Sequence, residues 1–406
     1  MAWPEWNVTA QIDRIKETSD HEVKAEVKLT SARPTSSGHL RSGRLNLTSP
    51  ASRNSFAKSL MARDSEVDWD EVMEQLCMAV LEDWRKGTPL IELDGNVDVK
   101  AQAKWLIEPI IQLNNPTLIY GPGSAGKSWF AQYIAVLADE GLSHGGFHVE
   151  PARVLILDWE TSHDEIGARV TMIRHGLGLE GASHILYRTM TQGLSSDIER
   201  IREICVEHSV DLVIIDSLGS ACMGEPESAE VVLRVFGAIR SLGVSALAID
   251  HSNKEGHLFG SVYKFNSARQ VFEAKKSQHE DAEKIVLGLF HKKANNSKLL
   301  RPLGFELSFG DASIAIERRD VKDTELEEHM RVIDRIANAL SRAGKLTVSQ
   351  IAEEIDKEES HVRKELSYGK RSGKFALLPD GKWALPAREL EQAAAKIYEQ
   401  EMEGEI

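Results

Sequence analysis

A glycine-rich octapeptide that ends in lysine and serine is the clearest chemical signature of the sequence. Residues 121–128 read GPGSAGKS and fit the pattern G-x-x-x-x-G-K-[ST], between a strand-like apolar run and a helix-like segment. Glycines let backbone N–H groups approach phosphate oxygens, and the helix start adds its positive end. We expect Lys127 to reach the β- and γ-phosphates of a nucleotide and Ser128 to hold Mg²⁺. The predicted nucleotide-binding residues are Gly121, Pro122, Gly123, Ser124, Ala125, Gly126, Lys127, Ser128 and Trp129.

A carboxylate for the metal follows another apolar run. The segment DLVIID ends in Asp216. P-loop ATPases hold Mg²⁺ with an acid at the carboxyl end of a strand, and this edge of a parallel sheet faces the ligand. The motifs therefore predict Asp216 as a metal ligand beside Ser128, with ATP and Mg²⁺ as cofactors. An aspartate that only caps the next turn is the structural alternative.

A glutamate follows a third strand-like run, in RVLILDWETS, where Asp158 and Trp159 precede Glu160. With the two motifs above, this element resembles the RecA-like ATPases of the replicative helicase type. The nearest resemblance is to the plasmid RepA group, with DnaB and KaiC as more distant relatives. It implies that Glu160 is the general base that activates the attacking water. A solvated or capping glutamate is the alternative.

Three later segments extend the resemblance, which covers about residues 100–319. In ALAIDHSNK a strand ends in Asp250 and His251, and RepA-like proteins carry a similar histidine that can sense the γ-phosphate. GSVYKFNSARQVFEA looks like the Gly-Ser segment of the family. LGLFHKKANNSKLLRPLGFEL is similar to its final hairpin, which carries a Lys-x-Asn or Lys-x-Arg pair. That pair reaches the nucleotide of the neighbouring subunit, and here it falls on Lys293 and Asn295, with Lys292 and Arg301 as alternates.

The resemblance implies a homo-oligomer, a hexameric ring, whose subunits complete one another's sites. Two departures bear on that expectation. The hairpin offers lysine and asparagine where many relatives place an arginine, and lysine lacks the planar fork that arginine presents to a phosphate. The loop HSNKEGHLFG is short, which leaves little material for a long DNA-binding loop.

The elements that must position these residues follow an alternating pattern. Near-continuous apolar runs separated by helical segments predict a mostly parallel sheet with helices on both faces, an α/β RecA-like P-loop core over residues 101–322. We expect a small β-rich region over residues 1–65 and a helical connector over 66–100. The strand-like runs of the core are TLIY, RVLILDW, HILYRT, DLVIID, SALAID and KIVLGLF.

The C-terminal part predicts a winged helix over residues 329–386. Three helix-like segments precede KFALLPDGKWAL, in which Asp380-Gly381 is a strong turn signal. Basic residues on the third helix and its exit could meet DNA phosphates, but glutamates in the same segment fit a protein-binding or packing role nearly as well. An acidic helix or tail is expected over 387–406. The candidate DNA-binding residues are Arg363, Lys364, Lys370 and Arg371.

Composition limits the classes of protein. Among 406 residues, 49 Lys and Arg face 63 Asp and Glu, and a net charge of −14 argues against a protein that coats nucleic acid over its whole surface. The three cysteines form no CxxC pair, so neither a disulfide framework nor a zinc site is indicated. No signal-like start and no run of eighteen apolar residues occurs, so we expect a cytoplasmic protein without a membrane partner.

Three functions are consistent with these observations. The first is a RepA-like ring helicase or translocase that hydrolyses ATP on single-stranded DNA during replication or recombination of a phage, plasmid or other mobile element. The second is a RecA-like ATPase that loads or remodels replication or recombination proteins without unwinding. The third is a nucleotide-gated, KaiC-like binding module whose winged helix recruits partners.

Overall fold

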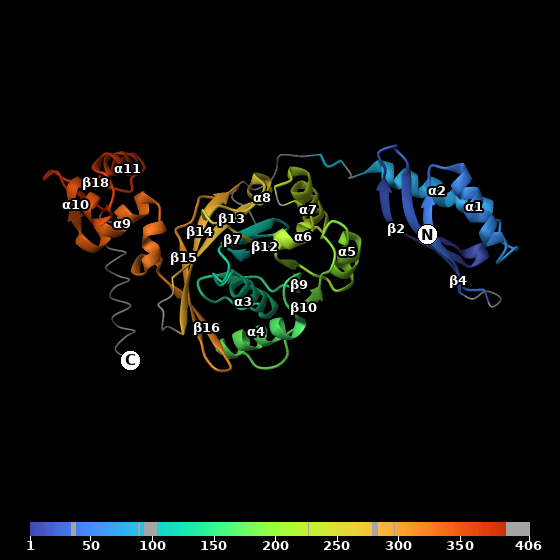
Figure 1. Cartoon of the computed structure of the whole chain (residues 1–406), viewed down its shortest axis with the longest axis horizontal. Helices are drawn as coiled ribbons and strands as arrows, with labels where there is room; N and C mark the ends of the chain where they lie inside the picture. Colours follow the sequence, from blue (N-terminus) through green and yellow to red (C-terminus); the bar gives the residue numbers. More distant parts are fainter. Residues whose placement is uncertain are drawn as a thin grey trace. The chain divides into compact units, whose positions relative to one another are not determined.

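The structure is a computed structural model, and it describes residues 1–33, 38–87, 90–92, 104–225, 227–277, 283–295 and 297–386. The chain divides into two compact units, Met1–Val99 and Lys100–Ile406 (Figure 1). The expected tail over 387–406 and most of the expected connector beyond residue 92 lie outside the described residues.

The N-terminal unit is an antiparallel sheet closed on one face by two helices. Its strands follow the order β1-β2-β3-β4, and α1 and α2 begin at the N-caps Ser49 and Asp68, whose side chains accept backbone N–H bonds. The elements are β1 (Ala2–Trp3), a 3₁₀ turn (Pro4–Trp6), β2 (Val8–Glu17), β3 (Val23–Ser31), β4 (His39–Asn46), α1 (Pro50–Met61) and α2 (Trp69–Lys86).

Helix α2 belongs to the core of this unit. Its apolar stripe, with Trp69 and Leu76 fully buried, packs in the same cluster as Leu29 and Leu45 of the sheet. The sequence predicted this helix as part of a connector from residue 66. The structure instead places it in the N-terminal unit, because one face of an antiparallel sheet must be covered by apolar side chains.

The second unit is built on a large mixed sheet, as the apolar runs predicted. In the described residues nine strands follow the order β10-β9-β11-β12-β7-β13-β14-β15-β16. Neighbours from β10 to β13 pair in parallel, and the pairs from β13 to β16 are antiparallel. The strands of this sheet are β7 (Pro116–Gly121), β9 (Val154–Asp158), β10 (Leu186–Thr189), β11 (Leu212–Asp216), β12 (Ser245–His251), β13 (Gln270–Ser277), β14 (Lys284–Ala294), β15 (Leu303–Phe309) and β16 (Ile314–Arg319).

Helices cover both faces of the parallel part, because consecutive residues of each strand point to opposite faces and nearly all of them are apolar. Ile119, Ile156 and Ile214 pack against α3 and α4, whereas their neighbours in the strands pack against α5, α6 and α7. Figure 1 shows these helices on opposite sides of the sheet. The helices are α3 (Lys127–Glu140), α4 (His163–Gly176), α5 (Ile198–Glu207), α6 (Leu218–Cys222), α7 (Ala229–Ser241) and α8 (Val262–Ser267), and a small second sheet holds β5 (Trp105–Glu108), β6 (Ile111–Gln112) and β8 (His148–Val149).

Beyond the large sheet, three helices and three short strands enclose a separate apolar core. The strands pair antiparallel in the order β17-β19-β18, and the turn that joins the last two contains Gly381 with φ +78°. No helix among the described residues is long and apolar enough to cross a membrane. The elements are two 3₁₀ turns (Val321–Asp323 and Glu325–His329), α9 (Val332–Ala343), β17 (Lys345–Leu346), α10 (Val348–Glu354), α11 (Glu359–Arg371), β18 (Ala376–Leu377) and β19 (Trp383–Ala384).

Candidate functional site

The strand register brings the predicted site residues to one edge of the sheet. His251 at the end of β12 is the register partner of Gly121 at the end of β7. Asp216 at the end of β11 is the partner of Asp158 at the end of β9. The carboxyl ends of four adjacent parallel strands therefore carry the acids, the histidine and the glycine-rich loop, which is where a sheet of this kind binds its ligands.

The glycine-rich loop leads directly into α3. Gly126 has φ +88°, a left-handed conformation that glycine adopts without strain. A Cβ on Gly121 would lie 2.3 Å from the carbonyl oxygen of Ala274 in β13, so only glycine fits there. No side chain in the described residues caps the first turn of α3. Its first N–H groups and its positive end can therefore bind a phosphate.

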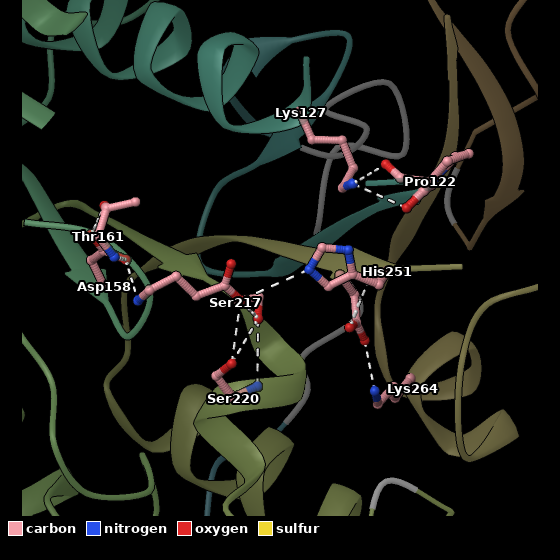
Figure 2. A network of polar contacts seen from close by, with 11 residues as sticks. Pro122, Lys127, Asp158, Thr161, Ser217, Ser220, His251 and Lys264 are labelled. Atoms are coloured by element: carbon pink, nitrogen blue, oxygen red, sulfur yellow. Dashed lines mark hydrogen bonds and ion pairs between the residues drawn. The ribbon is translucent and has the colours of Figure 1, made fainter. Parts of the chain in front are cut away.

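Lys127 lies buried at the start of α3. Its ammonium donates hydrogen bonds to the carbonyl oxygens of Gly121 at 3.0 Å and Pro122 at 2.6 Å, as Figure 2 shows. Burial lowers the pKa of this lysine, and the negative charges of Asp216, Asp250 and Glu160 oppose that effect. A cation held here faces the carboxylate edge of the sheet, where it can balance phosphate charge.

Asp216 and Ser128 form the oxygen pair that suits Mg²⁺. Burial raises the pKa of Asp216, and the negative charges of Glu160 and Asp158 raise it further. A hydrogen bond with Ser128 opposes this rise. Among the residues that the structure describes, no cluster of three or more acids, histidines or cysteines could hold a metal by itself. Mg²⁺ usually binds to one or two protein oxygens and takes its remaining ligands from phosphates and water, so Ser128 and Asp216 would be enough to hold it.

Glu160 lies across from these residues, just beyond β9. Its Oε1 accepts hydrogen bonds from the hydroxyls of Ser217 at 2.5 Å and Ser220 at 3.3 Å, and His251 Nε2 lies 3.8 Å from the same oxygen (Figure 2). Side chains from three strand ends thus meet at one carboxylate. Such a carboxylate can accept a proton from water bound at the edge of the sheet.

Asp158 organises the loop that carries Glu160. Its buried carboxylate accepts hydrogen bonds from the N–H groups of Glu160 at 2.9 Å and Thr161 at 3.2 Å, and it is also bound by the hydroxyls of Thr161 and Tyr187. These bonds use both oxygens of Asp158, so its part is to orient Glu160.

His251 stands on a rigid strand end. The carboxylate of Asp250 accepts the N–H of His251 at 2.9 Å and the ammonium of Lys264 at 2.7 Å. Both charged groups of the Asp250–Lys264 pair are almost completely buried, whereas the side chain of His251 is about half exposed. The pair ties α8 to the end of β12.

Sequence reasoning missed Ser217, Ser220 and the Asp250–Lys264 pair. The serines had a weak signal, since Ser217 follows the strand that ends in Asp216, and a hydroxyl at that point lies on the same edge. Lys264 had none, because fourteen residues separate it from its partner and only the folded loop brings them together.

The four residues that could reach a neighbouring subunit's nucleotide differ in their contacts and exposure. The ammonium of Lys293 donates to the carbonyl oxygens of Phe265, Asn266 and Ala268 at 2.7–3.0 Å, so it closes the C-terminal end of α8 in its own subunit. Lys292 pairs with Glu273 at 2.8 Å. Arg301 and Asn295 are exposed.

Trp129 follows Ser128 in the first turn of α3. Its half-buried ring packs edge-on against Phe309, with the ring centres 5.5 Å apart, and Arg169 lies over it at 5.3 Å. These contacts join α3 to α4 and to the hairpin of β15. Trp129 therefore has packing partners of its own in this structure.

The basic residues suggested for DNA lie on α11 and are exposed. Arg363 pairs with Glu359 at 2.7 Å, one helical turn earlier. The buried side of the same helix, with Val362 and Leu366, holds it against α9 and α10. The helix thus presents a mixed, mainly cationic face to solvent. The four candidates on it are Arg363, Lys364, Lys370 and Arg371.

Comparison with known proteins finds a family model that spans the glycine-rich loop. Residues 89–257 match a protein-family model described as an AAA domain. A solved structure of a KaiC-like protein from the hyperthermophilic archaeon Pyrococcus horikoshii OT3 is similar at 15% identity over 52% of this chain and 93% of its own, with a TM-score of 0.39. No curated protein matches the chain. The second unit thus contains a P-loop ATPase domain, a mixed α/β fold on a large, mostly parallel sheet.

Proposed function

We propose that the protein is a ring-forming motor of the RepA helicase type that hydrolyses Mg-ATP and moves on single-stranded DNA, in replication or recombination of a phage, plasmid or other mobile element. The observation that carries this proposal is the position of Glu160. Its carboxylate is held 2.5 Å from Ser217 at the strand edge that also carries Lys127 and Asp216. A site that only bound nucleotide would not need a restrained carboxylate there.

Each side chain has a part in this proposal. Glu160 accepts the proton of the attacking water, and Lys127 stabilises the charge that develops on the γ-phosphoryl group. Ser128 and Asp216 hold Mg²⁺, which when bound neutralises phosphate charge. His251, 3.8 Å from Glu160, responds to the γ-phosphate and passes its state to the segment that follows β12.

The ring requires a cation from the neighbouring subunit. Lys293 is engaged by three carbonyl groups of its own chain, whereas Arg301 is exposed and has the planar fork that suits a phosphate. These surroundings favour Arg301 as the group that reaches the neighbour's nucleotide. A hexameric ring would then have one complete site at each subunit interface.

The C-terminal helices give the motor its contact with DNA in this proposal. The order of α9, α10, α11 and the β18–β19 hairpin fits a winged helix, and the exposed cations of α11 suit phosphate contacts. Replication or recombination proteins are further partners of the proposed assembly, in a cytoplasmic setting.

A second candidate is a KaiC-like ATPase that loads or regulates partner proteins without unwinding DNA. The bonds of Lys293 within its own subunit favour this candidate, because they remove one of the three basic groups that a neighbour could offer. The short segment between β12 and α8 favours it as well, since it gives little surface for DNA.

One experiment separates the two candidates. The ATPase rate of the full chain is measured with and without single-stranded DNA, alongside particle mass by light scattering and strand displacement on a forked duplex. A motor should form rings, accelerate about tenfold or more with DNA and displace the strand. A rate that ignores DNA, with no displacement, would reject the motor in favour of the second candidate.

A further inference from the structure

The N-terminal unit has one face that the fold leaves open. Residues on one side of β2, β3 and β4 are buried against α1 and α2, and those on the other side point to solvent. We call this second side the outer face. It consists of Thr9, Gln11, Asp13, Lys16, Lys24, Glu26, Lys28, Thr30, His39, Ser42, Arg44 and Asn46.

The register arranges the outer face in rows that cross all three strands. Gln11 is the partner of Lys28, which is the partner of Ser42. The next row joins Asp13, Glu26 and Arg44. Because directly opposed residues of an antiparallel pair lie about 5 Å apart, each row is a continuous strip of hydrogen-bonding groups.

We propose that the outer face binds the major groove of double-stranded DNA. The axes of β2, β3 and β4 in this four-stranded sheet span about 10 Å from the first to the last, and the major groove is about 12 Å wide. Strands in the major groove are an established way of reading bases. Gln11 has the amide that pairs with adenine, and Lys28 and Arg44 have the donors that pair with guanine.

Charge favours a nucleic acid on this face. The twelve residues of the outer face include four Lys and Arg against two acids, Asp13 and Glu26, whereas the whole chain has a net charge of −14. Glu26 already pairs with Arg14 at 3.3 Å, and Lys24 with Glu22 at 2.6 Å. No residue in the described part of the unit forms an ion pair with Lys16, Lys28 or Arg44.

The side chains of the outer face favour a duplex over other partners. Proteins that bind single strands or RNA loops stack bases on aromatic rings, and the outer face has no Phe, Tyr or Trp. It also has no Val, Leu, Ile or Met, which the centre of a protein interface requires. Hydroxyl, amide and cationic groups are the ones that read base edges and phosphates.

This inference is independent of the proposed ATP chemistry, because it concerns a unit with its own core. The test uses the full chain and a pool of randomised 30-base-pair duplexes, with the corresponding single strands as a second probe. Binding is measured by fluorescence anisotropy at several salt concentrations. The variants are Lys28→Glu/Arg44→Glu on the outer face, and Lys58→Glu/Arg85→Glu on α1 and α2 as a control with the same change in charge.

The outer-face variant should bind duplex at least tenfold more weakly than the parent and show a shallower dependence on salt. The control should stay within about twofold, and both should melt like the parent, since all four residues are exposed. Gln11→Ala should change the duplex sequences selected from the pool and leave the salt dependence intact. Equal losses in variant and control, unchanged duplex binding, or an equal loss for duplex and single strand would each overturn the proposal.

Discussion

The hydroxyl of Ser217 donates a 2.5 Å hydrogen bond to Oε1 of Glu160 and so joins the residue after β11 to the loop after β9. Ser220 and His251 approach the same oxygen. With Oε1 bound in this way, we expect Oε2 to be the oxygen that accepts the proton from water. The position of the carboxylate then depends on two strand ends together.

Glu160→Gln should bind Mg-ATP with nearly unchanged affinity and lower kcat by 10²-fold or more, because an amide can hydrogen-bond water but cannot take its proton. Single-turnover hydrolysis and a fluorescent ATP analogue measure the two quantities. Ser217→Ala is the companion change. It should lower kcat by roughly tenfold only, since Glu160 keeps its charge and loses one restraint. Loss of ATP binding in Glu160→Gln would mean that the residue is structural.

Lys127→Ala should abolish measurable hydrolysis while the protein still folds. The change removes a cation that would stabilise the transferring phosphoryl group, an effect of roughly 10²–10³-fold for one such donor. Among the described residues its ammonium donates hydrogen bonds only to the backbone carbonyls of Gly121 and Pro122, so the melting temperature should change little. The control is Lys104→Ala, an exposed lysine at the start of the unit. Turnover near the parent rate would refute the phosphate site.

Asp216→Asn should weaken nucleotide binding in the presence of Mg²⁺ more than in its absence, because only the metal uses the carboxylate charge. The pH profile provides a second check. Burial and the neighbouring carboxylates raise the pKa of Asp216, so the parent protein should lose Mg²⁺-dependent binding, as pH falls, at a higher pH than an ordinary aspartate would. The asparagine variant should lack this transition. Titration calorimetry from pH 8 to pH 5 measures both.

Arg301→Ala and Lys293→Ala should behave differently. Lys293 closes the end of α8, so its loss should lower the melting temperature, whereas Arg301 is exposed and its loss should lower only the ATPase rate. Mixing Arg301→Ala with Lys127→Ala should restore part of the activity, because some interfaces would pair an intact loop with an intact arginine. Absence of rescue in proven mixed rings, or full activity in a monomer, would exclude a shared site.

His291 gives the core a pH-dependent stability. Burial lowers the pKa of His291 to about 4, and the ring is held by Gln270 and by the N–H of Leu300. The folded protein therefore favours the neutral ring. The resulting contribution to the free energy of unfolding is fully present above about pH 6.5. It is lost as the pH falls towards 4, by up to about 3 kcal/mol.

Urea unfolding at pH 7.5, 6 and 5 measures this effect as a difference between the parent and His291→Gln. The variant should have a lower free energy of unfolding than the parent at pH 7.5, and this difference in free energy should become smaller at lower pH. His208→Gln, on the surface of the chain, is the matched control and should follow the parent at each pH. A gap that stays constant with pH would assign the stability effect to packing alone.

The parts of the site that the sequence predicted are those that depend on strand ends. A hydrophobic run followed by an acid or a histidine fixes both the strand and the edge at which it ends, so Asp216, Glu160 and His251 could be expected near the loop that contains Lys127. Contacts between side chains from distant elements could not be expected. A bulge between Val271 and Phe272 changes the pairing of β13 with β14 just where Lys293 lies, and no sequence pattern indicated that shift.

The boundary of the N-terminal unit also depends on contacts between distant elements, which the sequence did not predict. Alternation of polar and apolar residues predicted strands at the start of the chain, and an amphipathic stripe predicted the helix that is now α2. Neither pattern indicates that the apolar stripe of the helix covers the apolar face of this sheet. Trp69 is buried against the sheet through tertiary packing, which local patterns do not encode. This packing joins residues 1–65 to the helix that the sequence suggested as a separate connector.

The pair of Asp250 and Lys264 has a consequence for how fast the site can respond. A buried ion pair of this kind adds little net stability compared with apolar residues, but it restrains the backbone at the end of β12. The exposed ring of His251 can still rotate, and exposed side chains rotate within picoseconds to nanoseconds, whereas loops move more slowly. If His251 senses the γ-phosphate as proposed, its side chain responds to the nucleotide quickly. The slower movement of the segment between β12 and α8 then sets the time before any mechanical response.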